Sequence, residues 1–255
     1  MVILRKTFNK TMIKILYSLK LNILFRFVIN TFKRNYVTIL IYHSIGKPIN
    51  QEKSYLSISI EDFEKQMRYL KENYNLLSLN KATQILLTKG TFPKNSIVIT
   101  FDDGYKDNFN NALPILNKYD IPATIFLATN FISKNPFYLS WGDIQKMKNK
   151  IDFGSHTCSH KILTNLTTKE STKEIINSKK EIEEIIKKKV YSFAYPMGSK
   201  ENFNDEIKKI VAKSGFLCAC SSIHGTNNAK MDLFELKRKF VIERDINLFA
   251  YNLLF

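Results

Sequence analysis

Two adjacent aspartates, Asp102 and Asp103, end a short apolar and β-branched run that starts at Ser96, and Gly104 follows them. The run predicts a buried strand that carries two acids at its C-terminal end. Two ionised carboxylates side by side repel each other unless a cation or a shared proton compensates, so the pair indicates a metal site or an acid/base site. Neighbouring residues leave an extended chain in different directions, which lets one aspartate bind metal while the other moves a proton. An Asp-Asp-Gly turn that caps a helix is the plainer alternative.

A second motif contains His156 and His160, two of the four histidines in the chain. On a helical or turn-like backbone this spacing brings both imidazoles to one point, which is typical of metal ligands. Two surface histidines are the alternative. Together with Asp103 they would form a set of two imidazoles and one carboxylate, which leaves coordination positions open for water and substrate. Such an open set is a feature of catalytic metal sites.

The two motifs, TFDDG at 100–104 and SHTCSH at 155–160, resemble the first two motifs of the polysaccharide deacetylase family, which removes N-acetyl groups from sugars. Residues from about 37 to 245 follow the order of that family. The stretches ILIYHSI at 39–45 and FAYPMG at 193–198 resemble the branch that includes poly-N-acetylglucosamine deacetylases. That branch carries its acid histidine early in the chain, and the matching position is His43.

Amide hydrolysis requires an activated water, a stabilised oxyanion and a protonated leaving amine, and each has a candidate. A divalent metal on Asp103, His156 and His160 would activate the water; Zn²⁺ is the first choice, with Ni²⁺, Co²⁺ or Fe²⁺ as alternatives. Asp102 would take the proton of the water, and His43 would donate a proton to the leaving nitrogen. The expected substrate is an N-acetylated sugar of a surface polysaccharide or a glycolipid.

Other residues are expected around the reacting centre. The resemblance implies that a backbone N–H near Tyr195 and Pro196 adds to oxyanion stabilisation. Trp141, the only tryptophan, and Tyr105 are aromatic side chains that would stack on a sugar ring, although ordinary packing explains them equally well.

The chain departs from the wider family at two positions. Most members have an arginine where this chain has Ala194 and an aromatic residue where it has Met197. That arginine orients the base aspartate, and Arg238, expected on a late strand, is the candidate replacement. No late Leu-x-His motif occurs before the chain ends, which favours His43 as the acid, with His224 as the next candidate.

From Tyr36 onward, short strands alternate with helices, which predicts an α/β fold: a distorted (β/α) barrel of about seven strands. The expected strands are 37–42, 96–101, 123–128, 151–154, 190–194 and 216–221, with 239–242 closing the set. Helices are expected over 60–74, after the capping box of Thr167 and Glu170, and over 205–214. Active sites of such barrels lie at the C-terminal ends of the strands, where the candidate residues fall.

The formal net charge is +16 over 255 residues, and no acidic residue precedes Glu52. We therefore divide the chain into a basic amphipathic segment, 1–36, and a catalytic domain, 37–255. In the helix expected over 9–34, Lys14, Lys20 and Arg26 interrupt every apolar run long before it reaches the length that spans a membrane. The segment also lacks the uninterrupted apolar centre and the small-residue cleavage site of a secretory signal. The segment predicts peripheral binding to an anionic membrane, with the cytoplasmic face favoured. A helix packed on the domain, or a cell-surface location through an uncleaved or unusual signal, is the alternative.

Two other function classes remain at this stage. A non-haem iron oxygenase also uses two histidines and one carboxylate, but it has no evident need for a second aspartate beside its ligand. A non-enzymatic basic module that binds glycan or nucleic acid would fit the charge. That charge is concentrated near the N-terminus and no nucleic-acid motif accompanies it, so no nucleic-acid partner is expected.

Overall fold

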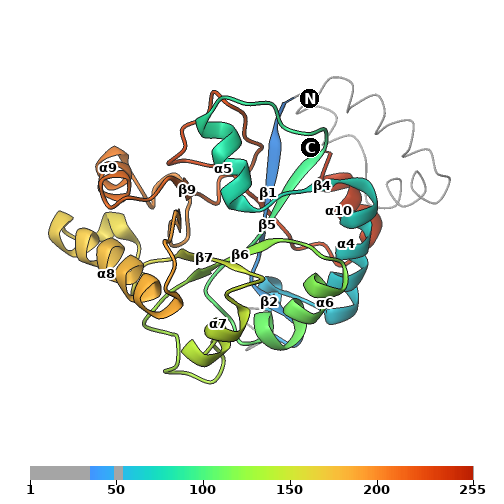
Figure 1. Cartoon of the computed structure of the whole chain (residues 1–255), viewed down its shortest axis with the longest axis horizontal. Helices are drawn as coiled ribbons and strands as arrows, with labels where there is room; N and C mark the ends of the chain where they lie inside the picture. Colours follow the sequence, from blue (N-terminus) through green and yellow to red (C-terminus); the bar gives the residue numbers. More distant parts are fainter. Residues whose placement is uncertain (1–34, 49–53, 255) are drawn as a thin grey trace.

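The computed structural model describes residues 35–48 and 54–254. A parallel sheet with strand order β10-β1-β5-β6-β7-β8-β9 lies at its centre (Figure 1). These strands are β1 (Val37–Tyr42), β5 (Ser96–Phe101), β6 (Ala123–Leu127), β7 (Asp152–Ser155), β8 (Ser192–Ala194), β9 (Cys218–Cys220) and β10 (Lys239–Phe240). Each neighbouring pair is parallel. The parallel order places the C-terminal ends of all these strands at one end of the sheet.

The chain between β9 and β10 closes the sheet on itself. Leu236 forms a parallel bridge with Cys220, and its N–H donates to the carbonyl oxygen of Ala219 over 2.9 Å. A few residues later, Lys239 and Phe240 pair with β1. This arrangement confirms the expected distorted barrel and places Arg238 directly before β10, beside β1 and within hydrogen-bond distance of Thr100 on β5.

Helices surround the sheet in Figure 1, with α4 and α10 near one edge and α7, α8 and α9 beyond β7. Their bounds are α4 (Ile60–Asn73), α5 (Leu79–Leu87), α6 (Leu113–Lys118), α7 (Trp141–Met147), α8 (Thr168–Ile186), α9 (Asp205–Lys213) and α10 (Ile246–Asn252). Short elements complete the fold: β2 (Ser44–Ile45), β3 (Ser57–Ile58), β4 (Asn75–Leu76), the 3-10 turns η1 (Ser54–Leu56) and η3 (Leu163–Asn165), and the π-helix η2 (Asn108–Ala112). The expected capping box of Thr167 and Glu170 is present at the start of α8.

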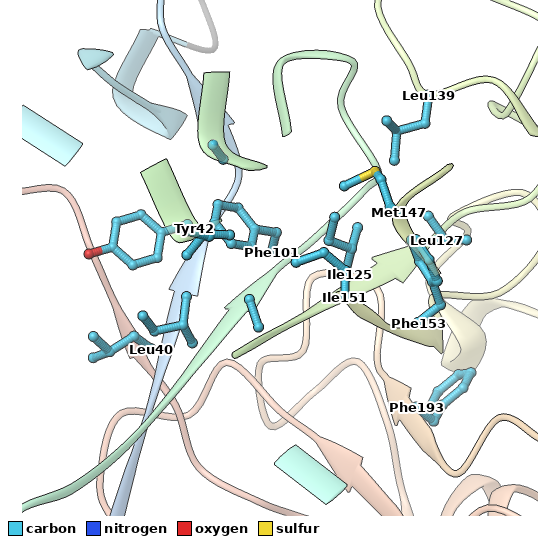
Figure 2. Packing of buried hydrophobic residues seen from close by; sticks show 14 of the residues in the cluster. Leu40, Tyr42, Phe101, Ile125, Leu127, Leu139, Met147, Ile151, Phe153 and Phe193 are labelled. Carbon is cyan, nitrogen blue, oxygen red and sulfur yellow. The ribbon is translucent and has the colours of Figure 1, made fainter. Parts of the chain in front are cut away.

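Alternate residues of the central strands pack into two different apolar layers. Leu40, Phe101 and Ile125 lie in the layer between sheet and outer helices, part of which Figure 2 shows. Val98 and Phe126, with the opposite strand parity, lie in a second cluster together with the apolar face of α5. Because successive side chains of a strand point to opposite faces, this second cluster fills the interior of the barrel. The same alternation places Thr100 and Asp102 on the interior side of β5.

The expected strands agree with the structure within one residue at 37–42, 96–101, 123–128 and 151–154, and the last three expected strands are longer than the observed ones. The helix expected over 9–34 lies outside the described residues, so the division of the chain at residue 36 stays a prediction. Among the helices of residues 35–48 and 54–254, none is long and apolar enough to cross a bilayer.

Candidate active site

Asp103, His156 and His160 converge at the C-terminal ends of β5 and β7. Their ligand atoms lie within 4.8 Å of one another. The Nε2 atoms of His156 and His160 lie 3.5 and 3.2 Å from Oδ1 of Asp103. Asp103 and His156 are buried, and His160 is partly exposed. The structure therefore brings together the three side chains that the sequence selects as metal ligands.

The hydrogen bond of Nδ1 shows which ring nitrogen of His156 carries the proton. Nδ1 lies 2.7 Å from the carbonyl oxygen of Ala194, which only accepts hydrogen bonds, so Nδ1 carries the proton. Burial lowers the pKa of His156 to about 4, because desolvation outweighs the opposing attraction of Asp102. At neutral pH the ring is uncharged and its Nε2 lone pair faces Asp103. A backbone carbonyl that orients a ligand histidine in this way is usual around metal ions.

The donor set fits a divalent cation. Oδ1 of Asp103 is buried and has no hydrogen-bond partner among the described residues. Burial by itself would raise the pKa of Asp103, but the close contact with His160 and the charges of the histidines hold it well below the ordinary value. An ionised carboxylate oxygen and an imidazole lone pair that face each other repel, and a cation between them would remove this repulsion. The chemistry of these three side chains therefore matches a metal site with open positions.

The backbone after β5 separates the two aspartates. Asp103 and Gly104 both have positive φ, 72° and 75°, whereas the N–H of Asp102 still donates to the carbonyl oxygen of Tyr42 over 3.0 Å. A Cβ atom at Gly104 would lie 2.9 Å from Cδ2 of Leu127, so only glycine fits this turn. The two carboxylates consequently leave the chain in different directions, toward different partners.

Asp102 is paired with Arg238. Nη1 and Nη2 of Arg238 donate to Oδ1 and Oδ2 of Asp102 over 2.7 and 2.8 Å, and both side chains are buried. Arg238 also donates through Nε to the carbonyl oxygen of Ser221, and through Nη1 to Oγ1 of Thr100. Burial would raise the pKa of Asp102, but the charge and hydrogen bonds of Arg238, together with the charges of His156 and His43, outweigh it and hold the pKa below its ordinary value. Asp102 is thus ionised, and its orientation is fixed at two points.

His43 follows β1 at the same end of the barrel. Together with the two aspartates and the metal-site histidines His156 and His160, it lines a cavity of about 180 Å³. Its ring lies 5.1 Å from the ring of Phe240. Burial lowers the pKa of His43, although the charges of the aspartates oppose that effect. The carbonyl oxygen of His43 accepts a hydrogen bond of 2.8 Å from the side chain of Asn108.

Several expected contacts are corrected by the structure. Tyr105 is 1% exposed and stacks on Tyr138 at 5.1 Å, so its ring face is not available to a sugar. Trp141 begins α7 and packs against the core, away from the cavity lining. Both rings are packing residues here, which their apolar area explains without a ligand. His224 is exposed and does not line the cavity either.

The structure also limits which backbone N–H near Tyr195 could donate to an oxyanion. The Tyr195 N–H donates to the carbonyl oxygen of Cys220 over 3.1 Å, and Pro196 has no N–H. The Tyr195 hydroxyl donates to the carbonyl oxygen of Phe234, so this side chain is held within the fold although it borders the cavity. The amide of Met197, the next residue in this turn, is left as the candidate.

Two exposed residues line the cavity: Tyr55, which was not selected from the sequence, and Met197, which was named there only as a departure from the family pattern. Tyr55, on η1, is 60% exposed, and Met197, in the turn after β8, is 63% exposed. Both line the cavity with Phe240. Exposed large apolar side chains beside a polar centre are a frequent feature of ligand sites. Tyr55 lies in a short turn without periodicity, so only its apolar character was visible in the sequence.

Comparisons with known proteins cover most of the chain. Residues 89–219 match the family model described as polysaccharide deacetylase. The Bacillus subtilis (strain 168) protein YxkH is 30% identical over 212 residues, which cover 82% of this chain and 73% of YxkH. The poly-beta-1,6-N-acetyl-D-glucosamine N-deacetylase of Staphylococcus aureus (strain MSSA476) is 33% identical over 198 residues, 72% of this chain and 66% of that protein. Streptococcus pyogenes deacetylase PplD, solved in complex with acetate, has a TM-score of 0.75 at 26% identity, covering 82% of this chain and 93% of PplD.

Proposed function

The chain belongs to the polysaccharide deacetylase family, and we propose that it hydrolyses the N-acetyl groups of a poly-N-acetylglucosamine polysaccharide with the help of a divalent metal ion. The observation that carries the metal dependence is the buried, unpartnered Oδ1 of Asp103, which faces two imidazole nitrogens. The proposed sugar is the one on which the Staphylococcus aureus relative, a poly-beta-1,6-N-acetyl-D-glucosamine N-deacetylase, acts. A lipid-linked sugar with the same acetamido group is the alternative substrate.

The proposed mechanism assigns one task to each side chain. Asp103, His156 and His160 hold the ion, which when bound polarises the acetyl carbonyl and lowers the pKa of a water. Asp102 accepts a proton from the attacking water, because it is ionised and lies in the same cavity. Arg238 holds both oxygens of Asp102 in place. The amide of Met197 is the proposed additional oxyanion donor.

His43 is the proposed acid. A proton donor for the departing amine must lie apart from the base, because water enters one face of the acetyl carbon while nitrogen leaves from the other side. His43 reaches the cavity from β1, whereas His156 and His160 follow β7. A histidine is suited to this task because its charge changes near neutral pH. The released products are acetate and a free amino sugar.

The oxygenase alternative is not retained. The second aspartate, for which an oxygenase has no evident use, is ionised and held by Arg238. The scaffold is a parallel α/β barrel of the deacetylase family.

Acetate release from a panel of N-acetylated glycans and lipid-linked sugars, with and without chelator, tests this function. We expect chelator-sensitive release from β-1,6-linked N-acetylglucosamine oligomers, restored by Zn²⁺ and compared with Ni²⁺, Co²⁺ and Fe²⁺. Metal content then separates the aspartates: Asp103→Asn should lose the ion. Asp102→Asn should keep the ion and lose roughly 100- to 10,000-fold in turnover. The proposal would be rejected if no substrate of the panel released acetate. Unchanged metal content in Asp103→Asn, His156→Ala and His160→Ala would reject it as well.

We further propose that the basic segment 1–36 attaches the enzyme to an anionic membrane surface, with the cytoplasmic face favoured. The support is its charge pattern, since no acidic residue precedes Glu52. Cationic side chains near such a surface contribute about 1 kcal/mol each. The full chain should sediment with anionic vesicles at low salt, and a variant lacking residues 1–34 should not. Equal sedimentation of both forms would contradict the proposal.

A further inference from the structure

The loop between the two metal-site histidines is held in an uncommon backbone conformation. Thr157 and His160 have φ of 67° and 57°. A β-branched residue such as Thr157 rarely adopts this left-handed conformation, because its Cβ crowds the backbone. The position of the His160 imidazole depends on these dihedral angles, because His160 lies beyond the turn while His156 follows β7 directly. Contacts from outside the loop must therefore stabilise the turn.

One carboxylate from a helix supplies those contacts. Oε2 of Glu174, in the first half of α8, accepts the N–H groups of both Cys158 and Ser159, over 2.9 and 2.8 Å. Its other oxygen, Oε1, accepts the hydroxyl of Ser159 over 2.8 Å. A carboxylate with several such bonds holds successive amides at a fixed angle, and bonds to an ionised acceptor are stronger than neutral ones.

The remaining backbone groups of the loop are bound elsewhere. The N–H of Thr129 donates to the carbonyl oxygen of Thr157, and the N–H of Asn130 donates to that of Cys158. The N–H of His160 donates to Oγ1 of Thr157 over 3.0 Å. Glu174 thus accepts from two consecutive backbone N–H groups, and no other contact of this loop within the described residues takes over that role.

We propose that Glu174 is a positioning residue for the metal site: it fixes the turn that sets the His160 imidazole against His156 and Asp103. Glu174 touches neither the ion nor the substrate, and it acts through the backbone of Cys158 and Ser159. This inference rests on the proposed metal-dependent function. Its consequence is a site whose affinity depends on a carboxylate of α8 that lies outside the ligand set.

Metal affinity of the purified protein tests this assignment without an activity assay. Zn²⁺ is titrated in competition with a chromogenic chelator, and Co²⁺ absorption reports the geometry of the site. We expect Glu174→Ala to raise the Zn²⁺ dissociation constant by roughly 10- to 100-fold, as the loss of contacts behind metal ligands usually does. Glu174→Gln keeps one acceptor oxygen and should lie between Ala and wild type. Glu184→Ala, an exposed position on the same helix, is the matched control and should behave as wild type.

The outcomes separate this inference from the function on which it rests. Wild-type protein that binds neither Zn²⁺ nor Co²⁺ would overturn the proposed metal site, and the role of Glu174 with it. Wild-type binding combined with unchanged affinity in Glu174→Gln and Glu174→Ala would overturn the role of Glu174 alone. If Glu174→Ala does not fold, the affinity and Co²⁺ spectrum of Glu174→Gln decide. A lower melting temperature with wild-type affinity and spectrum would show a purely structural role and reject the proposal.

Discussion

Arg238 donates one hydrogen bond to each carboxylate oxygen of Asp102, over 2.7 and 2.8 Å, from a position 136 residues away in the chain. Both groups are buried, so each charge depends on the other for compensation. The segment that carries Arg238 also closes the barrel between β9 and β1. One contact therefore joins the closure of the fold to the orientation of the proposed base.

Replacement of Arg238 by Met should destabilise the protein by about 3–5 kcal/mol at neutral pH, because a buried carboxylate loses its partner. The pKa of Asp102 is lowered in the fold, so the pair stabilises the protein above the unfolded pKa of 3.8, and this contribution is lost as the pH falls further. The cost of Arg238→Met should accordingly shrink in acid. Urea denaturation at several pH values measures it.

Arg238→Lys keeps the charge but not the two-point contact, so it should lose turnover while it retains metal and most of the stability. Arg68→Met, at an exposed position on α4, is the control for loss of an arginine. A cost for Arg238→Met that does not vary with pH would argue against this account of the pair.

Asp107 gives an independent pH prediction. Burial raises its pKa to about 6, although the hydroxyl of Ser44 and the amide of Asn108 donate to it over 2.5 and 3.0 Å. Because the folded pKa exceeds the unfolded value of 3.8, the protonated group favours the fold. That contribution is complete below pH 3.8 and is lost as the pH rises through 6, by at most about 3 kcal/mol.

Asp107→Asn should therefore be more stable than wild type at pH 8 and lose this advantage near pH 4. The side-chain oxygen of Asn can accept from Asn108 and its NH₂ group can donate to Ser44, so these two side-chain contacts survive the change. Paired denaturation curves of the two proteins at pH 4, 6 and 8 measure the difference, and other titrating groups cancel between them. An advantage that is constant from pH 4 to 8 would show that the pKa of Asp107 is not raised.

Elements with a clear apolar pattern in the sequence were predicted better than elements without one. β1 and β5 are found where the sequence placed them, because continuous buried, β-branched runs end at turn residues. The later strands β8 and β9 are shorter than expected, since apolar residues beside a strand continue its pattern without pairing. The π-helix η2 and the left-handed Thr157 leave no periodic signal at all.

The site was predictable where chemistry restricts the residue type. The carboxylates and imidazoles that have the spacing of metal ligands were selected from the sequence. Arg238 was also selected, to replace the arginine that most family members have at the position of Ala194. Aromatic rings carry no such restriction, because packing and sugar stacking use the same apolar area. Tyr105 was consequently misplaced, and Tyr55 was missed.

The exposed ring of Tyr55 leads to a prediction about substrate binding. If it packs on a sugar unit in the ground state and in the transition state alike, Tyr55→Ala raises KM and leaves kcat nearly unchanged. A contact of about 0.5–1.5 kcal/mol corresponds to roughly 2- to 13-fold in KM. Steady-state kinetics on N-acetylglucosamine oligomers provide the test. Tyr191→Ala removes a similarly exposed ring just before β8, at the opposite end of the barrel, and should leave KM unchanged.

The last prediction concerns His43 as acid rather than ligand. His43 borders the cavity from β1 and is not part of the three-residue cluster of Asp103, His156 and His160. Its backbone is held by Asn108, so removal of the imidazole should leave the turn in place. We therefore expect His43→Ala to retain wild-type metal content and melting temperature while turnover of N-acetyl substrates falls by roughly 100-fold or more.

The leaving group separates this role from others. Without a proton donor, an ester can expel its alcohol as an alkoxide, whereas an acetamide would have to expel a much more basic nitrogen anion. His43→Ala should therefore lose less activity on acetate esters than on acetamides. His224→Ala, an exposed histidine outside the cavity, is the matched control and should retain both activities. Turnover of ester and amide substrates with the same sugar, measured beside metal content, makes the comparison. Equal losses on both substrates, or loss of the metal itself, would remove His43 from the role of acid.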